Sequence, residues 1–386
     1  MNSNRNPQPM RLAIGGMLAL VVAMGIGRFV YTPILPMMVD EIGLSASQAG
    51  MIASSNYAGY LVGAIVAATS FLKGSRRTWM LVALMASAFT TLLMGWANSY
   101  IQFMALRFVA GVFSAWVLVF SSALIIDRLI SAGRGQLSAM HFAGVGVGII
   151  VASILTTLAA VTEGNWSDAW LYNGIFALLL VSAVTYLVAE GESAVIVSSF
   201  TPVANRRPIK WLLSAYGLFG FGYVITATFI IQMVRSSNYS LAVETWVWVL
   251  VGLAGIPSVW FWNKVANRIG NSKAFAIACI CEAFGVGASV LVVNLGGLIF
   301  AAIFLGGTIM GITALGLVEA RTRSIDDPRR ALAMMTAAFG FGQIVGPMVA
   351  GYTYDASGSF LLPSLLASAA LAAAAVLVQI RGPADM

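Results

Sequence analysis

Long apolar stretches, separated by short polar connections, divide this chain into twelve segments that are each long enough to cross a lipid bilayer. A membrane-spanning helix needs about 20 apolar residues in succession. The predicted spans are 12–39, 47–72, 78–97, 100–126, 136–161, 169–189, 209–234, 243–265, 273–293, 297–319, 331–353 and 360–380. This pattern predicts an all-α integral membrane protein with almost no sequence left for a soluble domain.

The second half of the chain repeats features of the first half at an offset of 195 or 196 residues. Gly25-Ile26-Gly27 returns as Gly220-Phe221-Gly222, and Gly144-Val145-Gly146 returns as Gly340-Phe341-Gly342. Duplication of a six-helix unit is typical of secondary transporters, which hold their substrate where the two halves meet. We therefore expect two pseudo-symmetric six-helix bundles and a cytoplasmic linker. Their predicted ranges are 1–190, 191–208 and 209–386.

The basic residues gather in alternate loops, which fixes the expected orientation. Of the 21 Lys and Arg residues, 18 lie in one set of loops or near the termini, and the opposite loops hold only Arg235. The other two, Arg28 and Arg107, lie within spans. Because positive charge stays on the cytoplasmic side, we predict a cytoplasmic (inner) membrane protein with both termini inside the cell. The net charge of +7 then reflects topology rather than nucleic-acid binding.

The composition gives no support for a metal, a cofactor or a disulfide. A hydrophobic content of 60% with 9% charged residues excludes an ordinary soluble domain. The two cysteines, Cys279 and Cys281, are two residues apart in one span and point to different helix faces. His141 is the only histidine, so there is no histidine cluster that could bind a metal ion.

Several motifs in both halves resemble the YbfB/YjiJ-like branch of the major facilitator superfamily. They are Gly25-Ile-Gly-Arg28-Phe-Val-Tyr31-Thr32-Pro33-Ile-Leu-Pro36, Asn56-Tyr57-Ala-Gly59-Tyr60, Tyr216-Gly-Leu-Phe-Gly-Phe-Gly222-Tyr223, Gly252-Leu-Ala-Gly-Ile-Pro257-Ser258 and Phe339-Gly-Phe-Gly342-Gln343-Ile-Val-Gly346-Pro347. The resemblance implies a twelve-helix transporter whose two bundles rock about a central site. It does not supply a substrate.

Arg28 is the most informative single position. It lies about 17 residues into the first span and about 12 before Asp40, so at about 1.5 Å per residue it is roughly 18 Å from the outer end. An arginine cannot snorkel that far, and a charge at this depth marks a pathway or an internal contact. We favour an anchor for an anionic group, because guanidinium pairs with carboxylate or phosphate through two hydrogen bonds. The alternative is a permanent internal hydrogen bond.

Other polar side chains within the spans are candidates for the same site. Tyr31 and Thr32 follow Arg28 at i+3 and i+4 and share its helix face. They could bind a ligand, or satisfy the helix backbone near Pro33 and Pro36, which remove donors and kink the chain. The remaining candidates for the cavity are Asn56, Tyr60, Tyr223, Thr226 and Gln343.

Three residues are candidates for proton coupling. Arg107, with Gly111, resembles the helix-4 arginine motif often linked to coupling; the alternative is a structural arginine with a partly snorkelled side chain. His141 has an ordinary pKa near 6.5, but a lone histidine among glycines is often a strut between helices. Glu282 lies in mid-span without a partner at helical spacing, whereas we interpret Glu319 as structural because Arg323 follows at i+4.

Two loops resemble the superfamily latch Asp-Arg-x-Gly-Arg. In the second half Asn267-Arg268 replaces the expected Asp-Arg, and the first-half loop around Arg76 and Arg77 has no aspartate. Asp127, at the end of the fourth span, is the candidate partner for Arg76 or Arg77.

These features favour a secondary transporter for a small organic solute, coupled to protons and acting as a monomer in the lipid bilayer. The basic Arg28, Arg107 and His141 lie in the first half, which favours an organic anion. The alternative is a proton-coupled multidrug or metabolite exporter with an apolar, aromatic cavity. A sensor would need an output domain, and an enzyme would need a reactive constellation of side chains; the sequence has neither.

Overall fold

The computed structural model describes residues 9–69, 74–190, 208–324 and 327–380, and every regular element in these ranges is a helix. Ten helices are long and apolar enough to cross a membrane. The pair Leu241–Gly255 and Ser258–Ile269, bent by 43°, makes an eleventh if it is one broken span, and a shorter apolar helix covers Leu361–Leu377. The all-α membrane fold is therefore confirmed, and the bent pair and the short helix lie where the other two of the twelve spans were predicted.

The helices follow one another with short connections. Their bounds are α1 Pro9–Leu20, η1 Val21–Ile26, α2 Tyr31–Ile42, α3 Ala46–Ala68, α4 Arg76–Met94, α5 Tyr100–Ser131, η2 Gly135–Leu137, α6 Ser138–Val161, α7 Trp166–Leu187, α8 Ile209–Ser236, α9 Leu241–Gly255, α10 Ser258–Ile269, α11 Asn271–Leu291, α12 Leu295–Arg323, α13 Pro328–Ser357 and α14 Leu361–Leu377.

Local sequence signals set several of the helix ends. Three helices begin with capping boxes, in which a side chain at the first position and one three residues later satisfy each other's backbone N–H groups. The pairs are Ser45 with Gln48, Ser99 with Gln102, and Asn165 with Asp168. At the other end, α2 and α13 each stop at a glycine with positive φ, Gly43 and Gly358.

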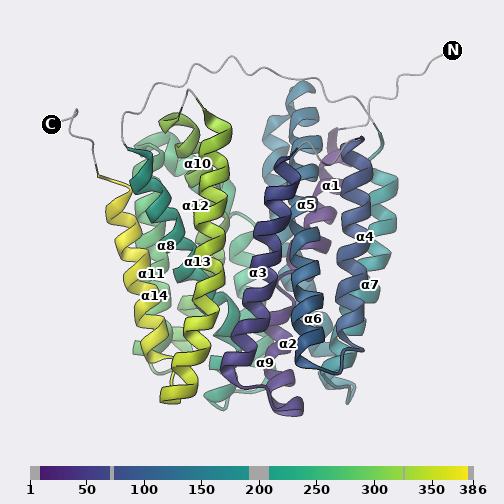
Figure 1. Ribbon diagram of the computed structural model, residues 1–386, viewed down its shortest axis with the longest axis vertical. Helices are drawn as coiled ribbons and strands as arrows, with labels where there is room; N and C mark the ends of the chain where they lie inside the picture. The colour runs from purple at the N-terminus through teal and green to yellow at the C-terminus, as the bar shows by residue number, and fades with distance from the viewer. Residues whose placement is uncertain (1–8, 70–73, 191–207, 325–326, 381–386) are drawn as a thin grey trace.

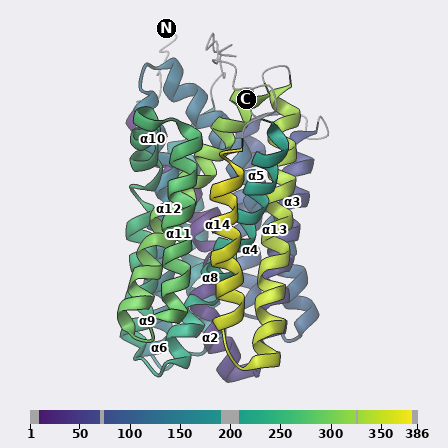
Figure 2. The ribbon, with the colours of Figure 1, turned by 90° about the vertical axis from the view of Figure 1, so that its left-hand side faces the viewer.

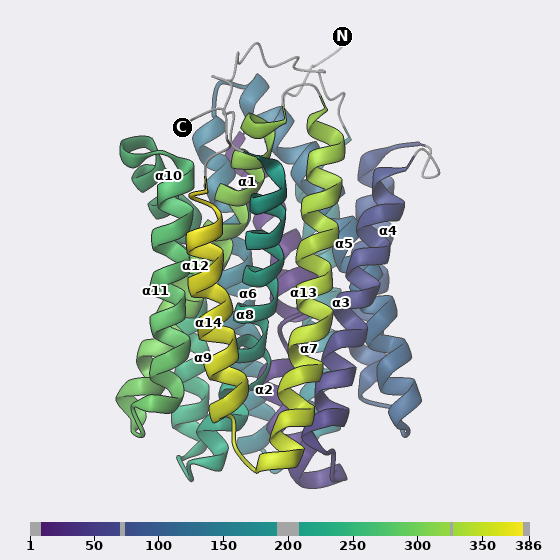
Figure 3. The same ribbon diagram turned by 60° about the vertical axis from the view of Figure 1, so that its left-hand side comes forward.

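The helices form two bundles, α1 to α7 and α8 to α14 (Figure 1). Within the second bundle, α14 packs between α11 and α8 (Figure 2). The bundles meet where α13 runs beside α3 (Figure 3), where α6 meets α9, and where α2 meets α8. The predicted linker, 191–208, lies outside the described residues except for Pro208.

Alternate glycines of α6 serve two different contacts. Gly144 and Gly148 face the first span, so that a Cβ on either would collide with the backbone of Met17 or of Gly25. Gly146 faces the other way, against the backbone of Gly252 in the second bundle. The small residues therefore bring α6 close both to its own bundle and to the partner bundle.

The first span is interrupted at residues 27–30, one turn before Pro33 and Pro36. The sequence suggested a kink near these prolines, but α2 runs through both of them. Pro33 acts upstream: it has no N–H to donate to Phe29, and the Phe29 carbonyl accepts instead from the Thr32 N–H at 3.3 Å. The carbonyl of Arg28 is thereby released from the helix ladder.

Candidate functional site

Arg28 lies in this interrupted turn, between the two bundles, and its side chain is only 4% exposed. Its guanidinium carbon is 4.3 Å from the ring centre of Tyr60 and 4.8 Å from that of Tyr57, both on α3. Nε and Nη2 have no hydrogen-bond partner among the described residues. Tyr57 and Tyr60 also lie within hydrogen-bonding reach of the guanidinium through their hydroxyls, so it is Nε and Nη2 that remain without a partner by distance and angle. The turn thus presents a buried cation with donors available to a ligand.

Arg107 holds the turn from the side of α5. It donates from Nη1 to the Gly27 carbonyl at 2.7 Å and from Nη2 to the Arg28 carbonyl at 2.8 Å. The snorkelled arrangement considered for Arg107 is wrong, because its side chain is 2% exposed and directed into the bundle. Asn56 supports it in turn, donating from Nδ2 to the Arg107 carbonyl at 2.8 Å. Arg107 therefore fixes the backbone that positions Arg28.

The second bundle contributes a polar pair opposite Arg28. Tyr223 on α8 is an electrostatic neighbour of Arg28, and its hydroxyl is hydrogen-bonded to the side-chain nitrogen of Gln343 on α13. Gln343 Oε1 has no partner among the described residues, and neither has the Thr226 hydroxyl. Both side chains are fully buried. Arg28, Tyr60, Tyr223 and Gln343 thus meet at one level of the bundle interface.

A stack of aromatic rings adjoins this pair and was not predicted from the sequence. Tyr216, Phe219 and Tyr223 of α8 stack with Phe339 of α13, with ring centres 4.9 to 5.7 Å apart. The three α8 residues are spaced i, i+3 and i+7, which places them on one helix face. That spacing was the available signal, but only the packing of α13 against α8 reveals the fourth ring.

Two predicted ligand-binding hydroxyls are used between helices. The Tyr31 hydroxyl donates to the Ala49 carbonyl at 3.0 Å, and the Thr32 hydroxyl donates to the Ala227 carbonyl of the second bundle at 2.6 Å. Both side chains are buried. Both hydroxyl donors already have protein acceptors in this conformation, so neither is counted among the groups that face a ligand at Arg28.

The other coupling candidates lie away from the Arg28 turn. His141 is buried within the first bundle, with Nε2 3.2 Å from the Ser122 hydroxyl of α5 and its ring against Gly16 of α1. Glu282 is fully buried on α11, beside Thr308 of α12, and its carboxylate oxygens form no hydrogen bond by distance and angle with the described residues. His141 is therefore placed as a strut, whereas Glu282 is an acid without an ionic partner.

The bundles are joined at the end opposite the two termini (Figure 1). Asp355 at the end of α13 accepts from the backbone N–H groups of Ala46 and Ser47 at 3.0 Å each. Arg235 at the end of α8 donates to Asp40 at the end of α2. Among the described residues, the inter-bundle hydrogen bonds lie between mid-helix and this end, including Ser54 to Ile344 and Thr157 to Thr245. This end is closed.

Comparison with known proteins identifies the architecture. The family model described as uncharacterised MFS-type transporter YbfB matches residues 20–379. The chain belongs to this family. An uncharacterized MFS-type transporter YcaD of Escherichia fergusonii is 26% identical over 273 residues, covering 68% of each chain. The YcaD protein of Escherichia coli K12 is 24% identical over the same length and shares.

Solved transporter structures share the fold of this MFS chain. A point mutant of the nucleoside transporter NupG has a TM-score of 0.73 at 13% identity, covering 95% of this chain and 98% of that one. A bacterial homolog of the human lysosomal transporter Spinster, in an inward-facing and unoccupied conformation, has a TM-score of 0.68 at 14% identity, covering 98% and 95%. Membership of the family makes the chain an MFS-type membrane transporter rather than an enzyme, and these solved structures share its fold.

The ion pair that the sequence suggested for the latch motif forms in the first bundle. Arg76 pairs with Asp127 at 3.3 Å, as the sequence suggested. Arg77 instead donates to the backbone carbonyls of Val188 and Thr185. These contacts join the start of α4 to the ends of both α5 and α7.

The second bundle of this MFS protein is held differently at the corresponding level. Asn267 and Arg268 are exposed and form no hydrogen bond or ion pair with described residues. Arg323 instead bonds Glu319 at 2.8 Å, the Ser272 hydroxyl at 3.2 Å and the Val378 carbonyl at 2.9 Å. The structural pairing of Glu319 with Arg323 is confirmed, and Ser272 is the partner that the sequence did not suggest.

Proposed function

We propose that this protein is a secondary active transporter that moves a small organic anion by alternating access. The observation that carries the proposal is Arg28, a buried cation between the bundles whose Nε and Nη2 have no hydrogen-bond partner in the part of the chain that the structure describes. Leaving a charge buried without a partner is costly. A carboxylate ligand would satisfy those donors in pairs and neutralise the charge.

The surroundings of Arg28 favour a ligand that brings the negative charge itself. Its side-chain neighbours are the rings of Tyr57 and Tyr60 and the electrostatic neighbour Tyr223, all of which are neutral. Gln343 Oε1 and the Thr226 hydroxyl offer further hydrogen bonds on the opposite side. The proposed substrate contacts are therefore Arg28, Tyr60, Tyr223, Thr226 and Gln343.

We further propose that transport is coupled to protons through Glu282. An acid buried without an ionic partner is suited to gain and lose a proton during the cycle. Its place inside the second bundle, away from the Arg28 turn, means that coupling would act through movement of α11 and α12. Arg107 and His141 serve as structural supports in this scheme.

The proposed setting is the cytoplasmic (inner) membrane, with a monomer whose termini and linker face the cytoplasm. The support is the clustering of basic residues at the end that carries both termini. In that orientation the closed end, with Asp40, Arg235 and Asp355, faces outward. The conformation would then be closed to the outside.

A second candidate, export of lipophilic metabolites or drugs, is favoured by one observation. The stack of Tyr216, Phe219, Tyr223 and Phe339 presents flat apolar rings beside the polar pair. Such rings could hold many planar compounds. Dye efflux from loaded proteoliposomes would support this candidate, particularly if it were insensitive to substitution of Arg28.

The deciding experiment is uptake of a panel of 14C-labelled carboxylates into proteoliposomes under an imposed proton gradient. We expect one or more acids to accumulate, Arg28→Ala to abolish uptake, and Arg28→Lys to retain a small part, because lysine keeps the charge without the paired donors. Normal uptake by Arg28→Ala, with correct insertion, would remove Arg28 from the site. Glu282→Gln is expected to uncouple accumulation from the gradient while leaving counterflow exchange.

A further inference from the structure

We infer that an apolar pocket lined by Phe29, the residue after Arg28, is the subsite for the hydrocarbon part of the carried anion. The substrate class would then be an amphipathic carboxylate, with its charge at Arg28 and an alkyl or aryl group in the pocket. This inference rests on the proposed transport of organic anions.

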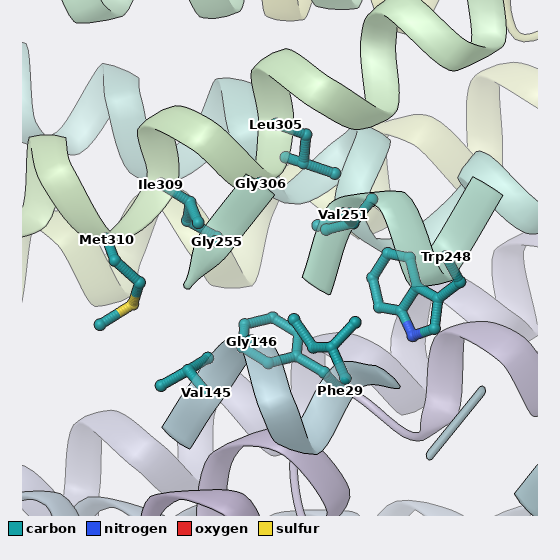
Figure 4. A pocket seen from close by; sticks show the side chains of 12 residues that line it. Phe29, Val145, Gly146, Trp248, Val251, Gly255, Leu305, Gly306, Ile309 and Met310 are labelled. Carbon is teal, nitrogen blue, oxygen red and sulfur yellow. The ribbon is translucent and has the colours of Figure 1, made fainter. Parts of the chain in front are cut away.

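The pocket lies between the bundles and is lined from both sides (Figure 4). Phe29 and Ile149 come from the first bundle, and Trp248, Val251 and Leu305 come from the second. The space is narrow in this conformation: about 10 Å³ admits the centre of a water molecule, whereas about 340 Å³ counts all the space between the atoms, open solvent included, so a ligand group enters only when the bundles separate. Its side chains are hydrophobic apart from one indole N–H, so water in it would find few partners. An apolar group is the better occupant.

Trp248 supplies the only unpaired polar side-chain atom among the residues that line the pocket. Its side chain is 1% exposed, and Nε1 has no hydrogen-bond partner among the described residues. In Figure 4 the indole stands at one end of the pocket, with its nitrogen on the side toward Phe29. A buried tryptophan N–H usually finds an acceptor. A ligand with a carbonyl or ether oxygen in its apolar part would provide one.

The pocket adjoins the Arg28 turn rather than forming a separate site. Phe29 follows Arg28 in the interrupted turn, and its ring centre is 5.7 Å from the guanidinium carbon. Ala227, which also lines the pocket, lies one helical turn from Tyr223 and accepts the hydrogen bond from Thr32. One molecule bound at Arg28 can therefore extend past Phe29 into the pocket once the bundles move apart.

The test compares carboxylates of equal charge and increasing apolar length, from acetate to hexanoate and phenylacetate. Their binding to the purified protein in one defined detergent is measured by thermal shift and by competition. Each methylene that leaves water contributes about fourfold in affinity, from about 0.8 kcal/mol per buried methylene. We expect wild-type affinity to rise steeply with length. Val251→Phe, which fills the pocket, should flatten this rise and leave acetate binding within twofold.

Matched variants separate the pocket from general damage. Leu253→Phe adds the same ring type two residues away on the exposed face of α9 and should keep the length dependence. Ile149→Phe fills the pocket from the other bundle and should behave like Val251→Phe, which guards against a folding defect in either one. Trp248→Phe should weaken binding of a carboxylate with an oxo group in its chain several-fold more than its alkyl counterpart.

The outcomes distinguish the inference from the proposed function. Carboxylates that bind wild type and depend on Arg28, but with no length dependence, would overturn the subsite and leave anion transport standing. Length dependence that persists unchanged in both filled variants would also overturn it and point to a lipid-facing surface instead. If no carboxylate binds wild type at all, the proposed function fails and the subsite fails with it.

Discussion

Arg235 Nη1 donates to Asp40 Oδ2 at 2.8 Å and so ties the last turn of α8 to the last turn of α2. Arg235 is itself anchored in the second bundle, because Nε and Nη2 bond both carboxylate oxygens of Glu244 on α9 at 2.8 and 2.6 Å. The bidentate pair orients the guanidinium, and Asp40 supplies the inter-bundle contact. The Arg235–Asp40 ion pair therefore joins the two bundles at the end opposite the termini, and it can break while the Arg235–Glu244 pair stays formed.

Asp40→Asn is expected to loosen this end without unfolding the protein. The Asp40 side chain is 55% exposed, so its ion pair should contribute only about 0.2–1 kcal/mol, or a roughly 1.4- to fivefold shift between conformations. Distances between spin labels at the C-terminal ends of α2 and α8 would report the shift. Glu244→Gln should disturb the bundle itself more strongly, since that side chain is 7% exposed. Equal behaviour of the two variants would contradict this division of roles.

Arg107→Gln is expected to lower stability as well as transport. Substitution leaves the carbonyls of Gly27 and Arg28 without their donors, and each buried unsatisfied group costs about 1–3 kcal/mol. The melting temperature in detergent should fall by several degrees. Arg107→Lys should recover part of the loss, because one ammonium can reach a carbonyl but cannot bridge both in the arginine geometry. An unchanged melting temperature with lost transport would indicate a direct coupling role instead.

The ion pairs Glu319–Arg323 and Asp127–Arg76 should differ sharply in their contribution to stability. Glu319 and Arg323 have side chains 4% and 0% exposed, whereas Asp127 and Arg76 are 42% and 49% exposed. Arg323→Gln should destabilise by about 3–5 kcal/mol, because it leaves Glu319 buried with much weaker compensation.

Arg76→Gln, the matched exposed control, should cost about 0–1 kcal/mol. Denaturant unfolding in mixed micelles provides the comparison. The double variant Glu319→Gln with Arg323→Gln should be more stable than Arg323→Gln alone. A result in the opposite order would mean that the buried carboxylate is compensated by other groups.

Gly148→Ala should destabilise the packing of α6 against the first span. A Cβ at residue 148 would lie 2.7 Å from both Gly25 Cα and the Val21 carbonyl oxygen, so the backbones must separate. Overpacking of this kind costs about 1–3 kcal/mol. Gly307→Ala is the control, since nothing lies within 4 Å of a Cβ there, and alanine is the better helix former by about 1 kcal/mol. Thermal melting of the two variants should move in opposite directions.

The sequence was sufficient for the features that depend on one helix at a time. Apolar length predicted the spans, and the depth of Arg28 predicted that its side chain avoids lipid. Contacts between helices could not be predicted in the same way. The hydrogen bond from Arg107 to the Arg28 carbonyl depends on where α5 crosses the first span. The pairing of Tyr223 with Gln343 joins residues 120 apart, and only packing of α13 on α8 brings them together.

Even within one helix, the sequence did not predict where the first span is interrupted. Pro33 signalled a disturbance, but its effect falls one turn upstream, where the Phe29 carbonyl loses its usual donor and recruits Thr32. Proline disturbs the carbonyl four residues earlier as well as its own position. The location of the break therefore follows from the hydrogen-bond ladder rather than from the proline itself.

Substitutions on the two sides of the contact between Asp355 and the start of α3 should have unequal effects. Two of the partners of Asp355 are main-chain amides at positions 46 and 47, which every amino acid except proline retains, and the hydroxyls of Ser45 and Ser47 add to them. Sequence drift at these positions should therefore weaken the closure without removing it, whereas loss of the acidic side chain on α13 removes every one of these bonds. A suppressor screen against an Asp355 variant should accordingly return changes elsewhere at this end of the molecule, and none at residue 46 or 47 that act by restoring the lost bond.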